Sequence, residues 1–380
     1  MQHKFLIAAV SLVATACGGG MMEPTGPSAS TASASRSQSL ALGAVYTLSN
    51  DASANAVLAF TRHTDGTLGT AVSVPTGGAG TGAGLGSQGS LVLDADARLL
   101  FAVNAGSNEI TSFRVTEAGL IQADKVPSGG TQPISVTIRG GLLYVLNAGG
   151  SGNITGFSVA SDGTMTPIRE STRSLSGSAA GPAQVGFSPD GQWLVVTEKN
   201  ANSIVTYRVA QNGRPSGRIV SASAGQTPFG FSFTSYGLLV VSEAFGGAPN
   251  ASAVSSYRIR TDGSLSVVSA SVANHQTAAC WVAIPSSNRF AFTTNTGSAS
   301  LSGLSIREGQ LSLLQPSGIA ATSGATPIDA AFGRDGQFLY ELSAGSHSIG
   351  AYQLQGASGD LTSVGSTYGL PASAVGLAAR

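Results

Sequence analysis

The sequence has little charge, few histidines and almost no cysteine. Charged residues make up 10% of the 380 residues, and 19 Lys and Arg balance 19 Asp and Glu. A neutral chain without a basic stripe is a poor candidate for binding a phosphate backbone, so we expect no nucleic-acid partner. The four histidines are not spaced like metal ligands, and we predict neither a metal nor another cofactor.

The two cysteines exclude a disulfide framework. Cys17 follows an apolar leader, and Cys280 lies in the apolar run 278–282. If Cys17 is lipidated, Cys280 has no partner within the mature domain, even in an oxidising compartment. We expect Cys280 to be a buried structural thiol rather than a nucleophile.

One short apolar run dominates the start of the chain. It extends from Phe5 to Ala16 after Lys4, which is the length of a signal-peptide core and too short to span a bilayer. The small residues at positions 14–16 and the following Cys17 resemble a bacterial lipobox; an ordinary secretory signal is the alternative. We therefore predict a signal peptide with lipobox at 1–16. The protein would be lipid-anchored in the cell envelope, periplasmic or at the cell surface, and otherwise secreted.

The rest of the chain divides into a tether and one large domain. Residues 17–39 hold the predicted lipidated cysteine and a Gly/Ser/Thr/Ala/Pro-rich stretch, which is typical of a flexible tether. In residues 40–380 a pattern of short apolar runs and turns recurs about every 50 residues. No stretch of helical length shows a 3.6-residue periodicity of apolar residues. We expect one all-β domain and a monomer whose only membrane contact is the lipid anchor.

A repeat recurs seven times in this domain. Its clearest copy covers 181–213, where a short apolar run meets Ser188-Pro189-Asp190-Gly191, a second apolar run follows, and an alternating run ends at Asn212-Gly213. Turn glycines mark the seven copies: Gly66, Gly119, Gly163, Gly213, Gly263, Gly309 and Gly359. Repeats of 40 to 50 residues with about four strands each indicate a seven-bladed β-propeller.

The first repeat lacks its inner strand. The tether runs almost directly into Val45, whereas 371–377 at the other end of the chain matches the inner-strand pattern of 182–187 when one extra residue is allowed. The C-terminal strand should therefore join the N-terminal blade and close the ring, which leaves no open edge. In this alignment Ala374 corresponds to Gln184.

Strand direction predicts which side chains meet at one mouth of the central channel. Inner strands begin, and second strands end, at the same side. The inner positions are Ser90, Ser135, Gln184, Gly230, Trp281, Asp329 and Ala374, and just outside them lie Asn104, Asn147, Glu198, Glu243, Asn295 and Ser343. We expect a small molecule or a protein to bind at this mouth, with Gln184, Trp281, Asp329, Asn104, Asn147 and Asn295 as binding residues.

Several of these residues have two interpretations. Glu198 and Glu243 occupy equivalent positions in adjacent blades and are the candidate catalytic pair, or they are solvated or paired with Lys199 or an arginine. Asp329 would act chemically or cap backbone amides. Trp281 would floor a ligand pocket or plug the channel. Glu341 interrupts an apolar strand, so it needs an ion-pair partner or a shifted pKa.

The clearest repeat resembles a known family. Residues 188–196 read Ser-Pro-Asp-Gly-Gln-Trp-Leu-Val-Val after Gly181-Pro182, with Tyr-Arg-Val at 207–209. This is similar to the lactonase-type seven-bladed propellers, which include bacterial 6-phosphogluconolactonase and fungal carboxymuconate cyclase. The resemblance covers about 40–380 and implies the fold and a lactone-hydrolase activity.

The chain departs from the pattern of the family's enzymes. They typically carry Pro-His where this chain has Pro182-Ala183-Gln184, and Pro-Arg-His where it has Pro228-Phe229-Gly230. Glutamine and glycine cannot shuttle a proton, and phenylalanine cannot hold a carboxylate or phosphate. Two functions remain open. One is an exported binding or scaffold propeller, and the other is a 6-phosphogluconolactonase-like hydrolase that uses the mouth carboxylates on a neutral lactone.

Overall fold

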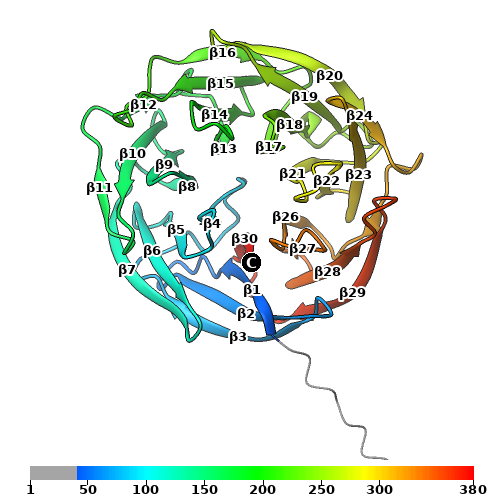
Figure 1. Ribbon diagram of the computed structural model, residues 1–380, viewed down its shortest axis with the longest axis horizontal. Helices are drawn as coiled ribbons and strands as arrows, with labels where there is room; N and C mark the ends of the chain where they lie inside the picture. Colours follow the sequence, from blue (N-terminus) through cyan, green and yellow to red (C-terminus); the bar gives the residue numbers. More distant parts are fainter. Residues whose placement is uncertain (1–40) are drawn as a thin grey trace, which may run out of the picture. The chain divides into compact units, whose positions relative to one another are not determined.

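Residues 41–380 form a ring of seven antiparallel sheets, or blades, in the computed structural model (Figure 1). The structure describes these residues, so the predicted signal peptide, Cys17 and tether lie outside the described part. Each blade has four or five strands. The prediction of an all-β, seven-bladed propeller is confirmed.

The strands of each blade follow one another from the channel outward. The inner strands are β4 (Leu91–Leu93), β8 (Pro133–Arg139), β13 (Pro182–Phe187), β17 (Pro228–Phe233), β21 (Ala279–Ala283), β26 (Pro327–Phe332) and β30 (Val375–Ala379). The second strands are β1 (Ala41–Leu48), β5 (Leu99–Asn104), β9 (Leu142–Asn147), β14 (Trp193–Glu198), β18 (Leu238–Glu243), β22 (Phe290–Asn295) and β27 (Phe338–Ser343).

The two outer positions complete each blade. The third strands are β2 (Ala56–His63), β6 (Glu109–Thr116), β10 (Asn153–Val159), β15 (Ser203–Arg208), β19 (Ala253–Ile259), β23 (Ser300–Arg307) and β28 (Ser348–Leu354). The outermost are β3 (Leu68–Pro75), β7 (Gly119–Pro127), β11 (Met165–Pro167), β12 (Arg173–Ser174), β16 (Ile219–Ala222), β20 (Leu265–Ala273), β24 (Gln310–Leu313), β25 (Ala321–Thr322) and β29 (Leu361–Tyr368). Within residues 41–380 the one helix is the 3-10 turn η1 (Phe245–Gly247), and no helix is long and apolar enough to cross a membrane.

The ring closes as predicted, with β30 paired to β1 in the sheet order β3-β2-β1-β30. The pairing includes Val45 with Ala379 and Thr47 with Leu377. Figure 1 shows β30 beside β1 at the channel. Blade 1 is therefore assembled from both ends of the described chain. The inner edge of β1 is paired with a further strand, as are the second strands of the other blades.

The predicted alignment of this last strand is wrong by two residues. Val45 pairs with Phe60 and Ala379, just as Leu194 pairs with Tyr207 and Phe187 in blade 4. Gln184 pairs with Thr197, whose counterpart in blade 1 is Leu48. Leu48 pairs with Val375 after a register shift that passes over Gly376, so the counterpart of Gln184 is Val375 and not Ala374. Along 377–379 a shift of two residues keeps every side chain on the same face of the strand, so the apolar pattern could not reveal it.

The hydrophobic core lies between neighbouring blades rather than in one central mass. For example, Tyr144 and Leu146 of blade 3 pack in one cluster with Val185, Leu194 and Tyr207 of blade 4. Second strands such as β14 and β18 are buried along their whole length, because both faces lie against another blade. The channel is consequently lined by the edges of the inner strands.

Candidate functional site

The two ends of the channel differ because one connection is long. We call the end where inner strands begin the start end, and the end with the Pro-Asp-Gly type turns the turn end. Fifteen residues, 76–90, separate β3 from β4, while the other connections between blades have four to seven. Residues 77–89, which we call the strap, contain seven glycines and lead to β4. In Figure 1 the loop before β4 extends toward the centre of the ring.

The strap crosses the start end and is held by four other blades. Ser87 donates its hydroxyl to Ile134 O of blade 3 at 2.8 Å, and its carbonyl accepts the Trp281 indole N–H of blade 6 at 2.9 Å. Gln88 exchanges two hydrogen bonds with the backbone of Val282, at 2.9 and 3.1 Å, and packs against Gly230. Lys199 of blade 4 donates to Gly86 O at 2.7 Å. The predicted ligand mouth is therefore covered.

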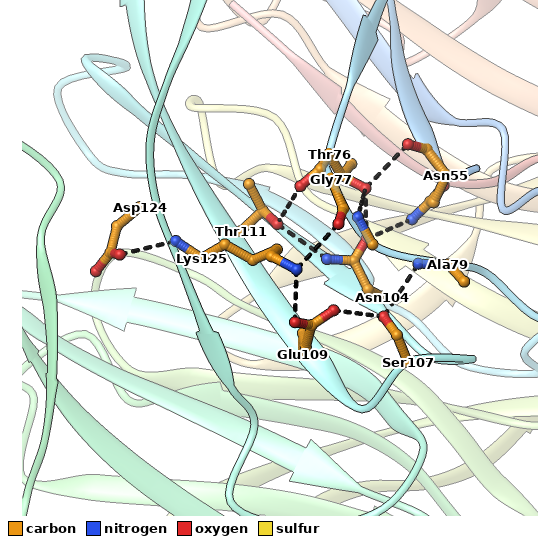
Figure 2. Close-up of polar contacts among 11 residues, drawn as sticks. Asn55, Thr76, Gly77, Ala79, Asn104, Ser107, Glu109, Thr111, Asp124 and Lys125 are labelled. Carbon is orange, nitrogen blue, oxygen red and sulfur yellow. Dashed lines mark hydrogen bonds and ion pairs between the residues drawn. The ribbon is translucent and has the colours of Figure 1, made fainter. Parts of the chain in front are cut away.

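A polar network fixes the foot of the strap (Figure 2). Lys125 donates to Gly77 O at 3.0 Å and pairs with Glu109 at 2.6 Å, and Ser107 connects Glu109 to the N–H of Ala79. Asn104, a predicted binding residue, lies in the same network. It accepts from Thr76 and Asn55 and donates to Thr111, at 2.6 to 3.0 Å. These bonds attach the strap to blade 2.

The turn end opens into a cavity of about 420 Å³, which is within the range of small-molecule sites. Its walls are the inner strands of all seven blades. Gln88, Gln184 and Asp329 line its floor, and Phe187, Phe233 and Phe332 stand partly exposed near its rim. The channel is a blind pocket, with a polar floor and an aromatic rim.

Asp329 is the one titratable group among the described residues that line this cavity. Its side chain is buried, and it accepts a hydrogen bond from its own strand at Ala330 N, 2.8 Å away. Burial raises its pKa well above the ordinary value, although bonds from the Ala330 and Leu377 amides oppose the shift. Burial therefore favours the neutral form of this carboxyl, which is the one titratable group among the described lining residues.

Gln184 lies on the cavity floor as predicted, but its amide group is occupied. It accepts from Phe231 N at 2.7 Å and donates to Phe231 O at 3.0 Å, both on the neighbouring inner strand. Gln88 makes the same pair of hydrogen bonds, one donated and one accepted, with the backbone of Val282 in blade 6. Because these amides satisfy exposed strand edges, we assign them a structural part in the floor.

Glu198 and Glu243 do not reach the cavity. Both are fully buried at the start end within their blades. Glu198 accepts from Ser176 N at 2.9 Å and from Ser203 Oγ at 3.0 Å, and Glu243 accepts from Gly225 N at 2.9 Å and from serine hydroxyls. Their predicted placement at an open mouth is wrong, because the second strand ends beneath the preceding interblade connection. Their catalytic role stays a prediction, and these contacts favour a structural one.

The asparagines at the same position are also fully buried. Asn147 donates to Asn153 Oδ1 at 2.9 Å and to Ser128 O at 3.3 Å, and Asn295 donates to Ser302 Oγ at 2.9 Å and accepts from Asn274 at 2.9 Å. The last residue of a second strand thus ties the preceding connection to its blade. Neither Asn147 nor Asn295 lies at the cavity.

Trp281 plugs the channel, which is one of its two predicted interpretations. Its side chain is buried, and its ring lies 4.8 Å from that of Phe229. Lys199 stands 4.7 Å from the same phenylalanine ring, and burial lowers the pKa of its ammonium group. The adjacent Cys280 is a buried free thiol, whose pKa burial raises to about 11.

Glu341 has no ion-pair partner among the described residues, so of its two expected outcomes the shifted pKa is the one that fits. It is fully buried, and burial raises its pKa to about 8. One oxygen accepts from Ser343 Oγ, while Oε2 has no hydrogen-bond partner in this part of the chain. The strand tolerates the acid as a neutral group.

The strap and the rim phenylalanines were not predicted to form the site. The length of the connection between residues 75 and 91 was the available signal, because other connections are less than half as long. Among residues 41–380, no group of three or more His, Cys, Asp or Glu could hold a metal ion.

The fold and this pocket define a seven-bladed propeller with a ligand-sized blind channel. The sequence matches the family described as "Lactonase, 7-bladed beta-propeller" over residues 43–179, 151–278 and 250–375. The chain belongs to this family. A search of curated proteins gives no match.

Solved structures of similar fold include lactonases. A putative 6-phosphogluconolactonase from Bacteroides fragilis is 17% identical with a TM-score of 0.68, and the match covers 88% of this chain and 97% of that one. A periplasmic gluconolactonase from Pseudomonas aeruginosa is 21% identical with a TM-score of 0.68, covering 87% and 98%. A putative 6-phosphogluconolactonase from Bacteroides uniformis is 18% identical with a TM-score of 0.66, covering 88% and 99%. At these identities the likeness shows the fold alone.

Proposed function

We propose that this lactonase-family propeller binds an uncharged small molecule in its central cavity, from the turn end. The observation that carries the proposal is the electrostatic character of the pocket. Asp329 is its one titratable lining group in the described chain, and burial favours the neutral form of that carboxyl. No lining residue supplies the arginine or histidine that a phosphorylated substrate would call for.

The strap supports a binding role. A pocket closed at one end removes a ligand from water on all sides but one, which strengthens each hydrogen bond to the strand edges. The partly exposed rim phenylalanines would cover an apolar face of the ligand. The expected partner is therefore a small molecule at the turn end rather than at the start end.

Lactone hydrolysis is the second candidate, and the family supports it. Proteins of similar fold include a putative 6-phosphogluconolactonase and a periplasmic gluconolactonase. In this chain Asp329 is the carboxyl that faces the cavity, so it replaces Glu198 and Glu243 as the group to test. It would act as a proton donor or, once ionised, as a base for water.

Binding and turnover of the same compounds separate the two functions. Glucono-δ-lactone and δ-valerolactone are the neutral probes, and 6-phosphogluconolactone is the anionic one. Calorimetry should show binding of a neutral lactone, with hydrolysis equal to buffer, and Ser232→Phe in the cavity wall should abolish binding. Ser235→Phe, in an exposed turn, is the control. Turnover that falls in Asp329→Asn would establish the hydrolase instead, and absence of both binding and turnover would overturn both functions.

We also propose export and lipid anchoring, on the apolar leader and the small residues before Cys17. Metabolic labelling with a fatty acid and membrane fractionation test this in a bacterial host. Cys17→Ser should remove the label and release the protein from the membrane fraction. A labelled Cys17→Ser variant, or an unlabelled natural chain that stays in the cytosol, would contradict the proposal.

A further inference from the structure

Six of the seven blades place a large apolar side chain against the turn glycine of the next blade. The side chain is the first residue of the second strand, and its cover is the turn glycine of the next blade. A Cβ on that glycine would lie 2.3 to 3.3 Å from the side chain in every case. The pairs are Leu99–Gly163, Leu142–Gly213, Trp193–Gly263, Leu238–Gly309, Phe290–Gly359 and Phe338–Gly66.

The seventh contact, between blades 1 and 2, is missing. Val45 pairs with Phe60 as Leu194 pairs with Tyr207, so Ala44 stands where Trp193 stands in blade 4. The cover of blade 2 is Gly119, and a Cβ there would meet no atom within 4 Å. A small residue therefore occupies the position that the other blades fill with Leu, Trp or Phe.

A cavity of about 980 Å³ lies at this junction, larger than the central one. We call it the seam groove, because it borders the pairing of β1 with β30. The lining residues used below are Ala44, Tyr46, Val74, Leu120, Arg334 and Arg380. Tyr46 is buried, and Val74 and Leu120 are partly buried, so one wall is largely apolar.

The other wall carries guanidinium groups without carboxylate partners. Arg62 also borders the groove, but it is paired with Asp335 at 2.9 Å. Arg334 donates to two backbone carbonyls of blade 2, and no described carboxylate lies within 4 Å of Arg334 or Arg380. Arg380 Nε is buried with no hydrogen-bond partner among the described residues.

Acidic groups also border the groove, and one of them, Asp96, accepts a bond from Arg334 through its backbone carbonyl. Asp96 and Glu117 are exposed in two turns of blade 2, and neither forms an ion pair in the described chain. Solvent screens exposed carboxylates more effectively than a buried nitrogen is screened. A bound negative charge is therefore stabilised most at the partly buried end of the groove near Arg380.

We propose that the seam groove binds a small amphipathic carboxylate, a molecule with one ring-sized apolar body and one anionic head. The body would take the volume that Leu, Phe or Trp fills at the other six junctions. The head would accept hydrogen bonds from Arg380 and Arg334, since guanidinium groups bind carboxylates strongly and with defined geometry. This site is separate from the central cavity and does not depend on it.

The test uses the full chain and a matched pair of probes, 3-phenylpropionate and its neutral amide. Calorimetry should show the acid bound about tenfold or more tightly than the amide, because only the acid pairs with guanidinium. Arg380→Gln and Arg334→Gln should each reduce that preference. Arg289→Gln is the matched control, because Arg289 also donates to two backbone carbonyls but does not border the groove.

A cavity-filling variant provides the second test. Ala44→Leu restores the residue that three other blades carry, so it should abolish probe binding and raise Tm by about 2 to 4 °C. Equal affinity of acid and amide would overturn the anionic class. A lower Tm in Ala44→Leu, with no probe bound by the natural chain, would overturn the site altogether and indicate that the groove is already filled, for example by residues before 41.

Discussion

The two ends of the channel use different chemistry although the same seven strands reach both. At the start end the strap, Trp281 and Phe229 are packed together, and Lys199 and Gln88 hold the strap with hydrogen bonds. At the turn end Phe187, Phe233 and Phe332 remain partly exposed around a cavity. The comparison shows that strand direction decides which residues share an end. The length of one connection decides which end is open.

The largest expected effect comes from removing β30, the inner strand of blade 1, which extends between the two ends of the channel. Deletion of residues 371–380 takes away β30 and leaves β1 with an unpaired edge facing the channel. We expect loss of cooperative folding, measured by circular dichroism on heating. Ser373→Ala, which removes only the bond to Ser49 O, is the control. A truncated chain that unfolds cooperatively at the natural Tm would contradict the closure argument.

An aromatic residue at each end gives the next comparison. Trp281→Ala removes the plug of the start end and should cost about 3 to 5 kcal/mol in denaturant unfolding. Tyr236→Ala removes a side chain that is 50% exposed in a turn at the other end and should change stability by about 0.5 kcal/mol or less. Equal losses in the two variants would show that the start end is not the more tightly packed one.

Gln88 in the strap and Gln184 in β13 make the same pair of backbone hydrogen bonds, so their variants compare the strap with an inner strand. Gln88→Ala and Gln184→Ala each leave two backbone groups without a partner, at a cost of about 1 to 3 kcal/mol. Hydrogen exchange should rise across residues 77–89 in Gln88→Ala alone, because only Gln88 belongs to the strap. Unchanged exchange there would mean that Ser87 and Lys199 hold the strap without it.

A pH dependence is expected from Glu341 near the start end of blade 7. Its pKa is 4.5 when unperturbed and about 8 in the fold, so the folded chain binds more protons between these values. The free energy of unfolding should therefore fall as pH rises from about 4.5 to 8, by at most about 1.4 kcal/mol per unit. Glu341→Gln should flatten this slope in urea titrations. An unchanged slope in the variant would show that another group causes it.

The repeat predicted the fold because each level of the sequence agreed with the others. Apolar runs, turn dipeptides and glycine spacing all indicated the same blade, and the match between 371–377 and 182–187 indicated closure. The register of β30 was not predictable, because a shift of two residues along 377–379 leaves the alternation of side chains unchanged.

The site was predictable only in part. Strand direction correctly placed Gln184 and Asp329 near the axis, since the inner strands run alike. Glu198 and Asn104 looked equally available, because a sequence does not show the connection that covers them. Their buried hydrogen bonds depend on residues 22 to 28 positions away, such as Ser176 and Thr76.

The position of β1 between two partners has a mechanical consequence. Hydrogen bonds join it to β2 on one edge and to β30 on the other, and all three strands lie antiparallel. A pull on residue 41 along the strand would load both ladders in shear, so many bonds would have to break together instead of one at a time. Such an arrangement makes the domain resistant to a force applied at its first strand.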